Sequence, residues 1–157
     1  MWMWLKYKGI RIMVSMTFKD FKYSVGEVVM FCQIIENDIK YIYASMLNGD
    51  FKANYEALLK DRVTLGQVVN MLQELDYSDD DHFFTEEEYD YLKKITGIRN
   101  HWCHQGYVNF VYIKDFANSK EYERECMFLT NDYDKLKSFY RVVHEIRNKA
   151  MMQYGRK

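Results

Sequence analysis

The chain contains no proline and only 7 glycines in 157 residues, and this scarcity of helix-breaking residues constrains its fold most. Proline removes a backbone donor and kinks a helix, and glycine weakens one, so a chain nearly free of both can form long helices. Apolar residues recur three to four positions apart along most of the sequence, which is typical of helices with one buried face. We therefore predict an all-α fold, an antiparallel helical bundle of four to five helices.

Polar residues that cap helices mark where the predicted helices begin. Ser24, Thr64 and Thr85 are each followed three positions later by Glu or Gln, which is the spacing of a capping box. The predicted helices span residues 24–47, about 51–59, about 64–75, 85–105 and from about 131 onward. Residues 106–130 are the least regular part, where the sequence allows short strands at 108–113 and 125–129.

Composition and charge narrow the class of protein. Apolar residues make up 48% and aromatic residues 17% of the chain, which indicates a folded protein with a sizeable core. We assign residues 16–157 to a single domain. The net charge is −1, so the chain is not a general polyanion binder. Contact with a polyanion would need a local basic patch, for which Lys93, Lys94 and Lys114 are candidates.

The first 15 residues differ from the rest of the chain. They are apolar but are interrupted by Lys6, Lys8 and Arg11, and they are too short and too charged to span a bilayer. We interpret residues 1–15 as an N-terminal extension, with translation beginning at Met16; an extra strand or an interface segment is the alternative. Three cysteines without CxxC spacing argue against a disulfide framework, and we expect a cytoplasmic protein with no membrane association.

The residues best suited to binding or catalysis lie late in the predicted helix 85–105. They belong to the segment Ile98-Arg99-Asn100-His101-Trp102-Cys103-His104. Arginine is always charged and holds phosphate with a planar fork of donors, and histidine exchanges protons near neutral pH. Such residues can cleave a phosphodiester without a metal. A zinc site is disfavoured, because no second Cys/His pair accompanies the two histidines. We expect neither a metal nor a cofactor.

The Arg-Asn-x3-His pattern of residues 99–104 resembles the Arg-x4-6-His motif of the HEPN domains. These are small helical domains, many of them metal-independent ribonucleases in prokaryotic toxin–antitoxin and phage-defence systems. The resemblance implies a helical bundle that covers about residues 24–154, with Arg99, Asn100 and His104 as catalytic residues. It also implies a homodimer with two motifs across its two-fold axis, and an antitoxin of the nucleotidyltransferase type as a partner.

Two residues of the first long helix fit a supporting role that the same resemblance implies. HEPN domains often carry a polar residue there that supports the motif, and Glu36 and Asn37 match in place. A carboxylate at Glu36 could pair with Arg99 or orient His104. The alternative is that Glu36, Asn37 and the adjacent Asp38 all face solvent.

Helical geometry separates the motif residues. At about 100° per residue, Asn100 and His104 lie roughly 40° apart on one face, whereas Arg99 lies about 140° from His104. Either the helix loosens in its last turn, or the active site is assembled from two chains; we favour the dimer. His101 points away from the apolar stripe, and we expect it to be a solvent-facing bystander.

The function that we expect is a metal-independent endoribonuclease that cleaves RNA through the 2′-OH to a 2′,3′-cyclic phosphate. His104 would act as general base or acid, Arg99 would hold the phosphate, and Asn100 would position His104 or a phosphate oxygen. Tyr107 and Phe110 could stack bases, although core packing is the more common use of such residues. The alternative is a non-catalytic HEPN-type module for dimerisation or partner binding, in which the motif surface is occluded or Arg99 is held in an ion pair.

Overall fold

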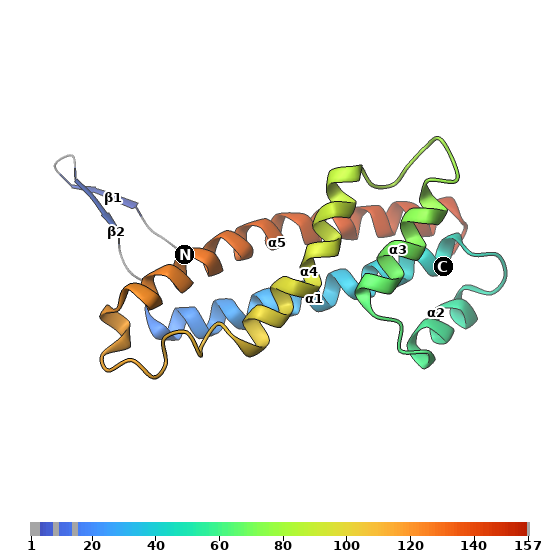
Figure 1. The fold of residues 1–157 in the computed structure, drawn as a ribbon. Coiled ribbons are helices and arrows are strands. Elements are labelled where there is room, and N and C mark those ends of the chain that lie inside the picture. Colours follow the sequence, from blue (N-terminus) through green and yellow to red (C-terminus); the bar gives the residue numbers. More distant parts are fainter. Residues whose placement is uncertain (1–3, 8–9, 14–15, 157) are drawn as a thin grey trace.

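A computed structural model describes the backbone of residues 4–7, 10–13 and 16–156, and the side chains of residues 16–156. Over residues 16–156 the fold is an all-α bundle, as predicted (Figure 1). Its helices are α1 (Phe18–Met46), α2 (Phe51–Lys60), α3 (Leu65–Asp76), α4 (Glu86–His104) and α5 (Lys120–Gln153), with a short 3₁₀ helix, η1, at Phe116–Asn118.

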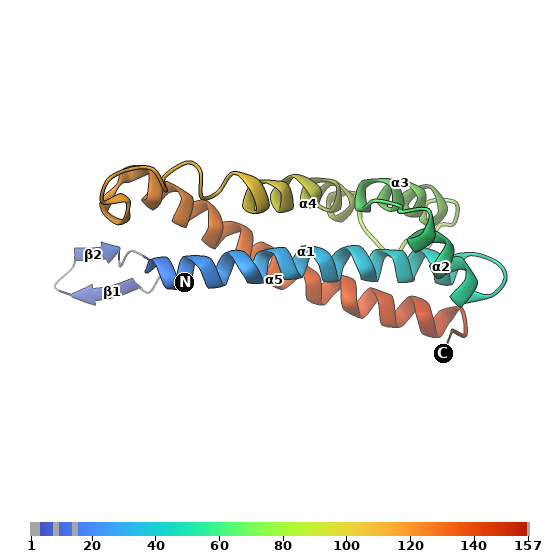
Figure 2. The same ribbon diagram turned by 90° about the horizontal axis from the view of Figure 1, so that it is seen from below.

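The two longest helices, α1 and α5, run parallel to each other along the length of the molecule (Figures 1 and 2). The Tyr122 hydroxyl donates to the Met16 carbonyl at 2.9 Å at one end, and the Arg156 guanidinium donates to the Leu47 carbonyl at 2.6 Å at the other. The long helix between α1 and α5 in sequence, α4, runs antiparallel to both: Arg99 contacts Glu36 and Trp102 contacts Phe21 on α1, while Trp102 contacts Asp132 and Tyr91 contacts Phe139 on α5. The predicted antiparallel bundle is therefore confirmed. Three long helices in an up-down-up order place the first and third in the same direction.

The last helix begins eleven residues earlier than predicted, at Lys120 instead of about Asn131. Ser119 caps it by accepting from the Tyr122 backbone N–H at 3.1 Å. Both predicted strands are wrong: residues 108–113 form turns, and 125–129 lie within α5. The buried side chains of Tyr122, Cys126 and Leu129 continue the helical spacing of the residues after 131, so the period of this helix was already present in the sequence.

The first helix also begins earlier than predicted. Thr17, not Ser24, caps α1, because the Thr17 side chain accepts from the Asp20 backbone N–H. The capping boxes at Thr64 and Thr85 are confirmed. The helix α1 ends at Met46, one residue before the predicted end at 47. Gly49 follows it with a φ of +93°, a backbone conformation that glycine adopts without strain.

An aromatic cluster forms the core at the end of the bundle where α1 begins. Phe21, Trp102, Phe110 and Tyr122 are all at most 1% exposed. Phe21 lies with its ring centroid 5.3 Å from that of Phe110 and 6.0 Å from that of Trp102. Phe110 is therefore a core residue that fastens the connection between α4 and α5, and it is not available for base stacking.

The backbone strands β1 (Trp4–Tyr7) and β2 (Ile10–Met13) pair as an antiparallel hairpin beyond the start of α1 (Figures 1 and 2). Residues 1–3, 8–9 and 14–15 of the predicted extension lie outside the described residues. The buried core begins at Met16, which is 6% exposed.

Removal of residues 1–15 is expected to leave the thermal unfolding midpoint nearly unchanged. The reason is that the core and its first hydrogen bond, from Tyr122 to Met16, are retained in the shortened chain. Calorimetry on the full chain and on a chain that begins at Met16 tests this. A loss of several kcal/mol in the free energy of unfolding, well beyond the usual range for surface changes, would show that the segment belongs to the core.

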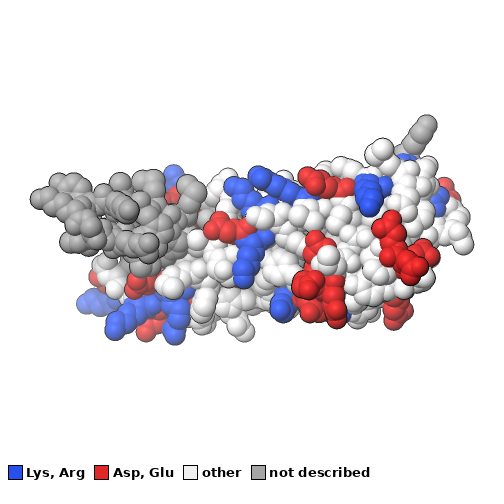
Figure 3. Space-filling model, turned by 90° about the horizontal axis from the view of Figure 1, so that it is seen from above, with Lys and Arg blue, Asp and Glu red and all other residues white. Residues whose placement is uncertain are grey.

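Charged side chains of both signs occur on the surface of the molecule. On the face drawn in Figure 3, basic and acidic groups form separate small patches, and neither sign covers the whole face. This agrees with the net charge of −1. Any attraction for a polyanion must therefore come from a local group of cations.

A buried carboxylate, Asp76, fixes the loop that leads into α4. It is 2% exposed, and it accepts from the Phe83 backbone N–H at 2.8 Å, the Phe84 backbone N–H at 3.2 Å and the Tyr89 hydroxyl at 2.8 Å. Burial and this hydrogen bond both raise the pKa of the Tyr89 hydroxyl well above its usual range. Asp76 therefore determines where α4 starts relative to α3.

Substitution Asp76→Ala is expected to lower the free energy of unfolding by about 3 kcal/mol, because it leaves three donors without an acceptor. Urea denaturation of the variant measures this. The matched control is Asp79→Ala, a change at an exposed acidic position of the same loop, which should stay within about 0.5 kcal/mol of the parent protein. Equal effects of the two variants would show that Asp76 does not organise the loop.

Candidate functional site

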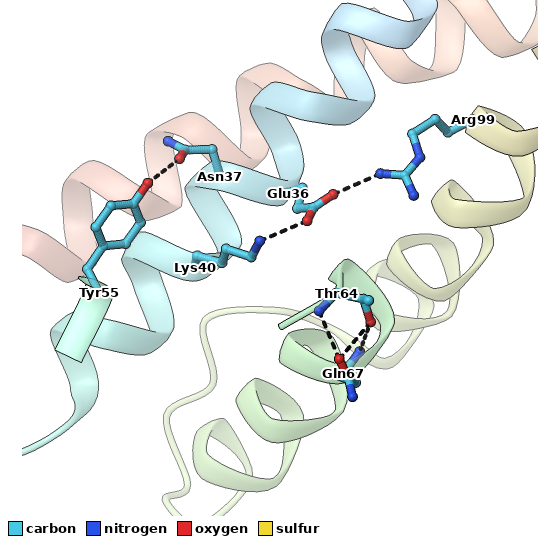
Figure 4. A network of polar contacts seen from close by, with 7 residues as sticks. All are labelled: Glu36, Asn37, Lys40, Tyr55, Thr64, Gln67 and Arg99. Atoms are coloured by element: carbon cyan, nitrogen blue, oxygen red, sulfur yellow. Dashed lines mark hydrogen bonds and ion pairs between the residues drawn. The ribbon is translucent and has the colours of Figure 1, made fainter. Parts of the chain in front are cut away.

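Arg99 lies on the side of α4 that faces α1, and it contacts Glu36 there. Its Nη1 donates to Glu36 Oε2 at 3.0 Å, and the side chains are 33% and 19% exposed (Figure 4). The carboxylate that the sequence pairs with Arg99 is thus next to it. The contact joins residues that are 63 positions apart, and it leaves part of the guanidinium open to solvent.

A second cation, Lys40, shares the same carboxylate. Its Nζ donates to Glu36 Oε1 at 2.8 Å, and its side chain is only 11% exposed. Both oxygens of Glu36 therefore have a cationic partner. The sequence analysis missed Lys40, although a Glu and a Lys four positions apart on a helix are a recognisable ion-pair signal.

These three charged side chains border a cavity of about 330 Å³ that is open to solvent. Gln33, Asn37 and the exposed Leu59 complete its wall. The cavity lies between α1, α2 and α4, and its charged groups carry a formal charge of +1, from two cations and one carboxylate. An anion that enters it would meet donors from α1 and from α4.

Asn37 does not support the motif directly. Its side-chain oxygen accepts from the Tyr55 hydroxyl at 2.6 Å, so it connects α1 to α2 (Figure 4). Tyr55 in turn packs on Tyr41, with 4.4 Å between the ring centroids. Asn37 therefore acts at the edge of the cavity and holds α2 in place.

His104 and Asn100 lie on the outer face of α4 and are exposed. Within the described residues, neither side chain has a hydrogen-bond partner. The helix stays regular through His104, so it does not loosen in its last turn. The separation of about 140° between Arg99 and His104 therefore remains, and one chain does not direct both side chains at the same point.

His101 is not a bystander, and that expectation was wrong. Its Nε2 lies 3.0 Å from Oε2 of Glu125, a residue that is 3% exposed. Asn109 donates to the other oxygen of Glu125 at 2.8 Å. The error has a clear cause: the early start of α5 places a helix against the side of α4 that the sequence analysis assigned to solvent.

Trp102 is a core residue that also forms a polar contact with α5. Its Nε1 donates to Asp132 Oδ2 at 2.8 Å. A Cβ atom at Gly106 would lie 2.6 Å from the Trp102 ring, so only glycine lets the chain turn this closely after α4. The contacts of Trp102 with Asp132 and of His101 with Glu125 therefore hold the last turn of α4 against α5.

A second buried carboxylate on α1, Asp38, faces α5. It is 2% exposed, and it lies 3.0 Å from His144 Nδ1 and accepts from Arg147 Nη1 at 3.2 Å. The three residues hold α1 and α5 in register. Sequence reasoning missed this group because Asp38 is more than a hundred positions from His144 and Arg147.

No close group of three His, Cys, Asp or Glu residues that could hold a metal ion occurs in the described part of the chain. Cys32 and Cys126 are buried, and burial raises the pKa of the Cys32 thiol to about 12 and that of Cys126 to about 11. Such thiols are poor nucleophiles near neutral pH. Cys103 is exposed.

Comparison of the chain with protein-family models, curated proteins and solved structures gives no match. Within the described residues, no helix has the length and apolar character needed to cross a membrane. The assignment of a function therefore depends on the geometry around Arg99 and His104.

Substitution Glu36→Gln is expected to lower the free energy of unfolding by about 1–3 kcal/mol, because it leaves two cations without their half-buried counter-charge. If Arg99 acts on RNA, cleavage should fall as well, since its guanidinium loses the group that orients it. Urea denaturation and an RNA cleavage assay measure the two effects.

The matched control for this change is Glu56→Gln. Glu56 also pairs with a lysine four positions away, Lys52, but at 3.8 Å and with both side chains mostly exposed. An exposed pair of this kind contributes at most about 1 kcal/mol. If the Glu36 and Glu56 variants are equally stable and equally active, Glu36 has no role beyond that of a surface carboxylate.

Proposed function

We propose that the protein is a metal-independent endoribonuclease of the HEPN type that acts as a homodimer. The observation that carries the proposal is that the motif side chains differ in their contacts and exposure. Arg99 is oriented by Glu36 and remains one-third exposed, while His104 and Asn100 stay open on the same helix. The guanidinium of Arg99 is thus oriented to bind a phosphate. The imidazole of His104, five residues later, is free to exchange a proton.

The proposed reaction needs only the RNA and these side chains. The ribose 2′-oxygen attacks its own adjacent phosphorus, the bond from phosphorus to the 5′-oxygen of the next nucleotide breaks, and a 2′,3′-cyclic phosphate forms. His104 takes the proton from the 2′-OH or gives one to the leaving oxygen. Arg99 offsets the negative charge that develops on the phosphate, and Asn100 positions His104 or a phosphate oxygen.

The regular geometry of α4 supports the proposed dimer. Because one helix turns Arg99 and His104 about 140° apart, a complete active site takes Arg99 from one chain and His104 from its partner across a two-fold axis. Toxin activity in a toxin–antitoxin or phage-defence system of the cytoplasm fits such an enzyme, and an antitoxin of the nucleotidyltransferase type is the partner that we propose for it.

A second candidate function rests on a specific contact. The ion pair between Arg99 and Glu36 is also what a non-catalytic HEPN-type dimerisation or partner-binding module would contain. In that case the cations serve a protein partner. The cleavage experiments below separate the two candidates.

Arg99→Ala and His104→Ala are each expected to abolish RNA cleavage while the protein stays folded, because charge stabilisation and proton transfer each contribute orders of magnitude in rate. Wild-type activity should persist in EDTA. Cys103→Ala is the matched control: it changes an exposed residue in the same turn that the mechanism does not use. Cleavage by the His104 variant at the wild-type rate would replace the catalytic proposal by the binding module.

A mixture of the two inactive variants tests the shared site. A heterodimer of Arg99→Ala and His104→Ala chains has one complete site, since the intact Arg99 and the intact His104 come from different chains. Random exchange of chains should restore about one quarter of wild-type activity. Light scattering that shows a monomer, or a mixture that stays inactive after exchange of chains, would remove the composite site.

A further inference from the structure

The cavity beside Arg99 contains more positive charge than its structural role requires. One cation is enough to neutralise Glu36, yet Arg99 and Lys40 both contact this carboxylate, at 3.0 and 2.8 Å. The Lys40 side chain is only 11% exposed. Removing an ammonium group from water costs free energy unless counter-charge replaces the solvent, and one carboxylate divided between two cations supplies only half of that charge.

The missing charge defines the ligand as an anion. Arg99 uses one nitrogen on Glu36 and Lys40 uses one of its three N–H donors, so both retain donors for a further acceptor. The Asn37 oxygen is occupied by the Tyr55 hydroxyl, which leaves its amide nitrogen as a donor. The polar part of the wall is therefore rich in donors and has a single charged acceptor, the arrangement that phosphate oxygens fit.

The size of the cavity and the rest of its wall indicate a ligand larger than a bare phosphate. About 330 Å³ is at the lower end of the range for small-molecule sites, larger than one phosphate group needs. Leu59 is 48% exposed at the cavity and offers an apolar surface to a flat ring. The amides of Gln33 and Asn37 provide polar groups that can reach ring edges.

We propose that the cavity formed by Gln33, Glu36, Asn37, Lys40, Leu59 and Arg99 binds one nucleotide, with its phosphate on Lys40 and Arg99 and its base against Leu59. The choice of a nucleotide as the anion rests on the proposed function. In the enzyme, this cavity holds the nucleotide next to the phosphate that is cleaved, and Lys40 is a binding residue that does not take part in proton transfer.

Binding of 5′-AMP to the full-length protein, measured by calorimetry at low salt, tests this inference without any cleavage step. We expect saturable binding, no saturable binding of adenosine, and inorganic phosphate binding at least about fivefold more weakly than AMP. Absence of saturable AMP binding overturns the proposal. Equal affinities for phosphate and AMP overturn the part that concerns the nucleotide.

Variants of two lysines locate the site. Lys40→Met is expected to weaken AMP binding at least about tenfold, and Lys40→Arg should retain it because the charge is kept. Lys40→Met leaves Glu36 paired with Arg99, so the ion pair between α1 and α4 is retained and the variant should fold. Lys52→Met is the matched control, since Lys52 forms the corresponding ion pair with Glu56 on α2 at an exposed position, and it should bind AMP as the wild type does.

The outcomes distinguish this proposal from the function on which it rests. AMP binding that depends on Lys40, in a protein that cleaves no RNA, supports the nucleotide site and rejects the ribonuclease. RNA cleavage that depends on Arg99 and His104, together with AMP binding that Lys40→Met does not change, rejects the nucleotide site and leaves the ribonuclease in place.

Discussion

A carboxylate that is removed from water must be paired or fully hydrogen-bonded, and this constraint determines how the helices of this bundle meet. Glu36 joins α1 to α4, Asp38 joins α1 to α5, and Glu125 joins α5 to the last turn of α4. Apolar burial is non-directional, whereas these polar contacts depend on the position of each partner. Each of these buried or half-buried carboxylates contacts a defined position on the neighbouring helix, so the contacts favour this arrangement.

The same contacts divide the motif helix into fixed and free residues. Arg99, His101 and Trp102 each donate to or contact a carboxylate of another helix, whereas Asn100 and His104 reach solvent. Asn100 and His104 therefore project from a helix, α4, that cannot rotate about its own axis without breaking these contacts. Catalysis by positioned groups needs such a fixed support, because a small error in orientation costs much of the rate advantage.

Local signals in the sequence predicted much of the fold, and long-range contacts account for most of what was missed. The caps at Thr64 and Thr85 depend on residues three positions apart, and the sequence alone located them. The pair of His101 and Glu125 spans 24 positions and that of Asp38 and His144 spans 106, so neither leaves a local pattern. The early start of α5 was missed for a different reason. The helical spacing of its apolar residues was present in the sequence, but the polar residues between them obscured it.

The charge around Arg99 also limits how the protein could hold RNA. Arg99 and Lys40 share Glu36, so an approaching phosphate meets a formal charge of +1 from the three groups, on a chain whose net charge is −1. Few counterions are released when so few phosphates are neutralised, and affinity for a polyanion then depends only weakly on salt. Tight nonspecific binding is therefore not available to this surface. Any specificity of the cavity must come from its shape and from its hydrogen-bond donors.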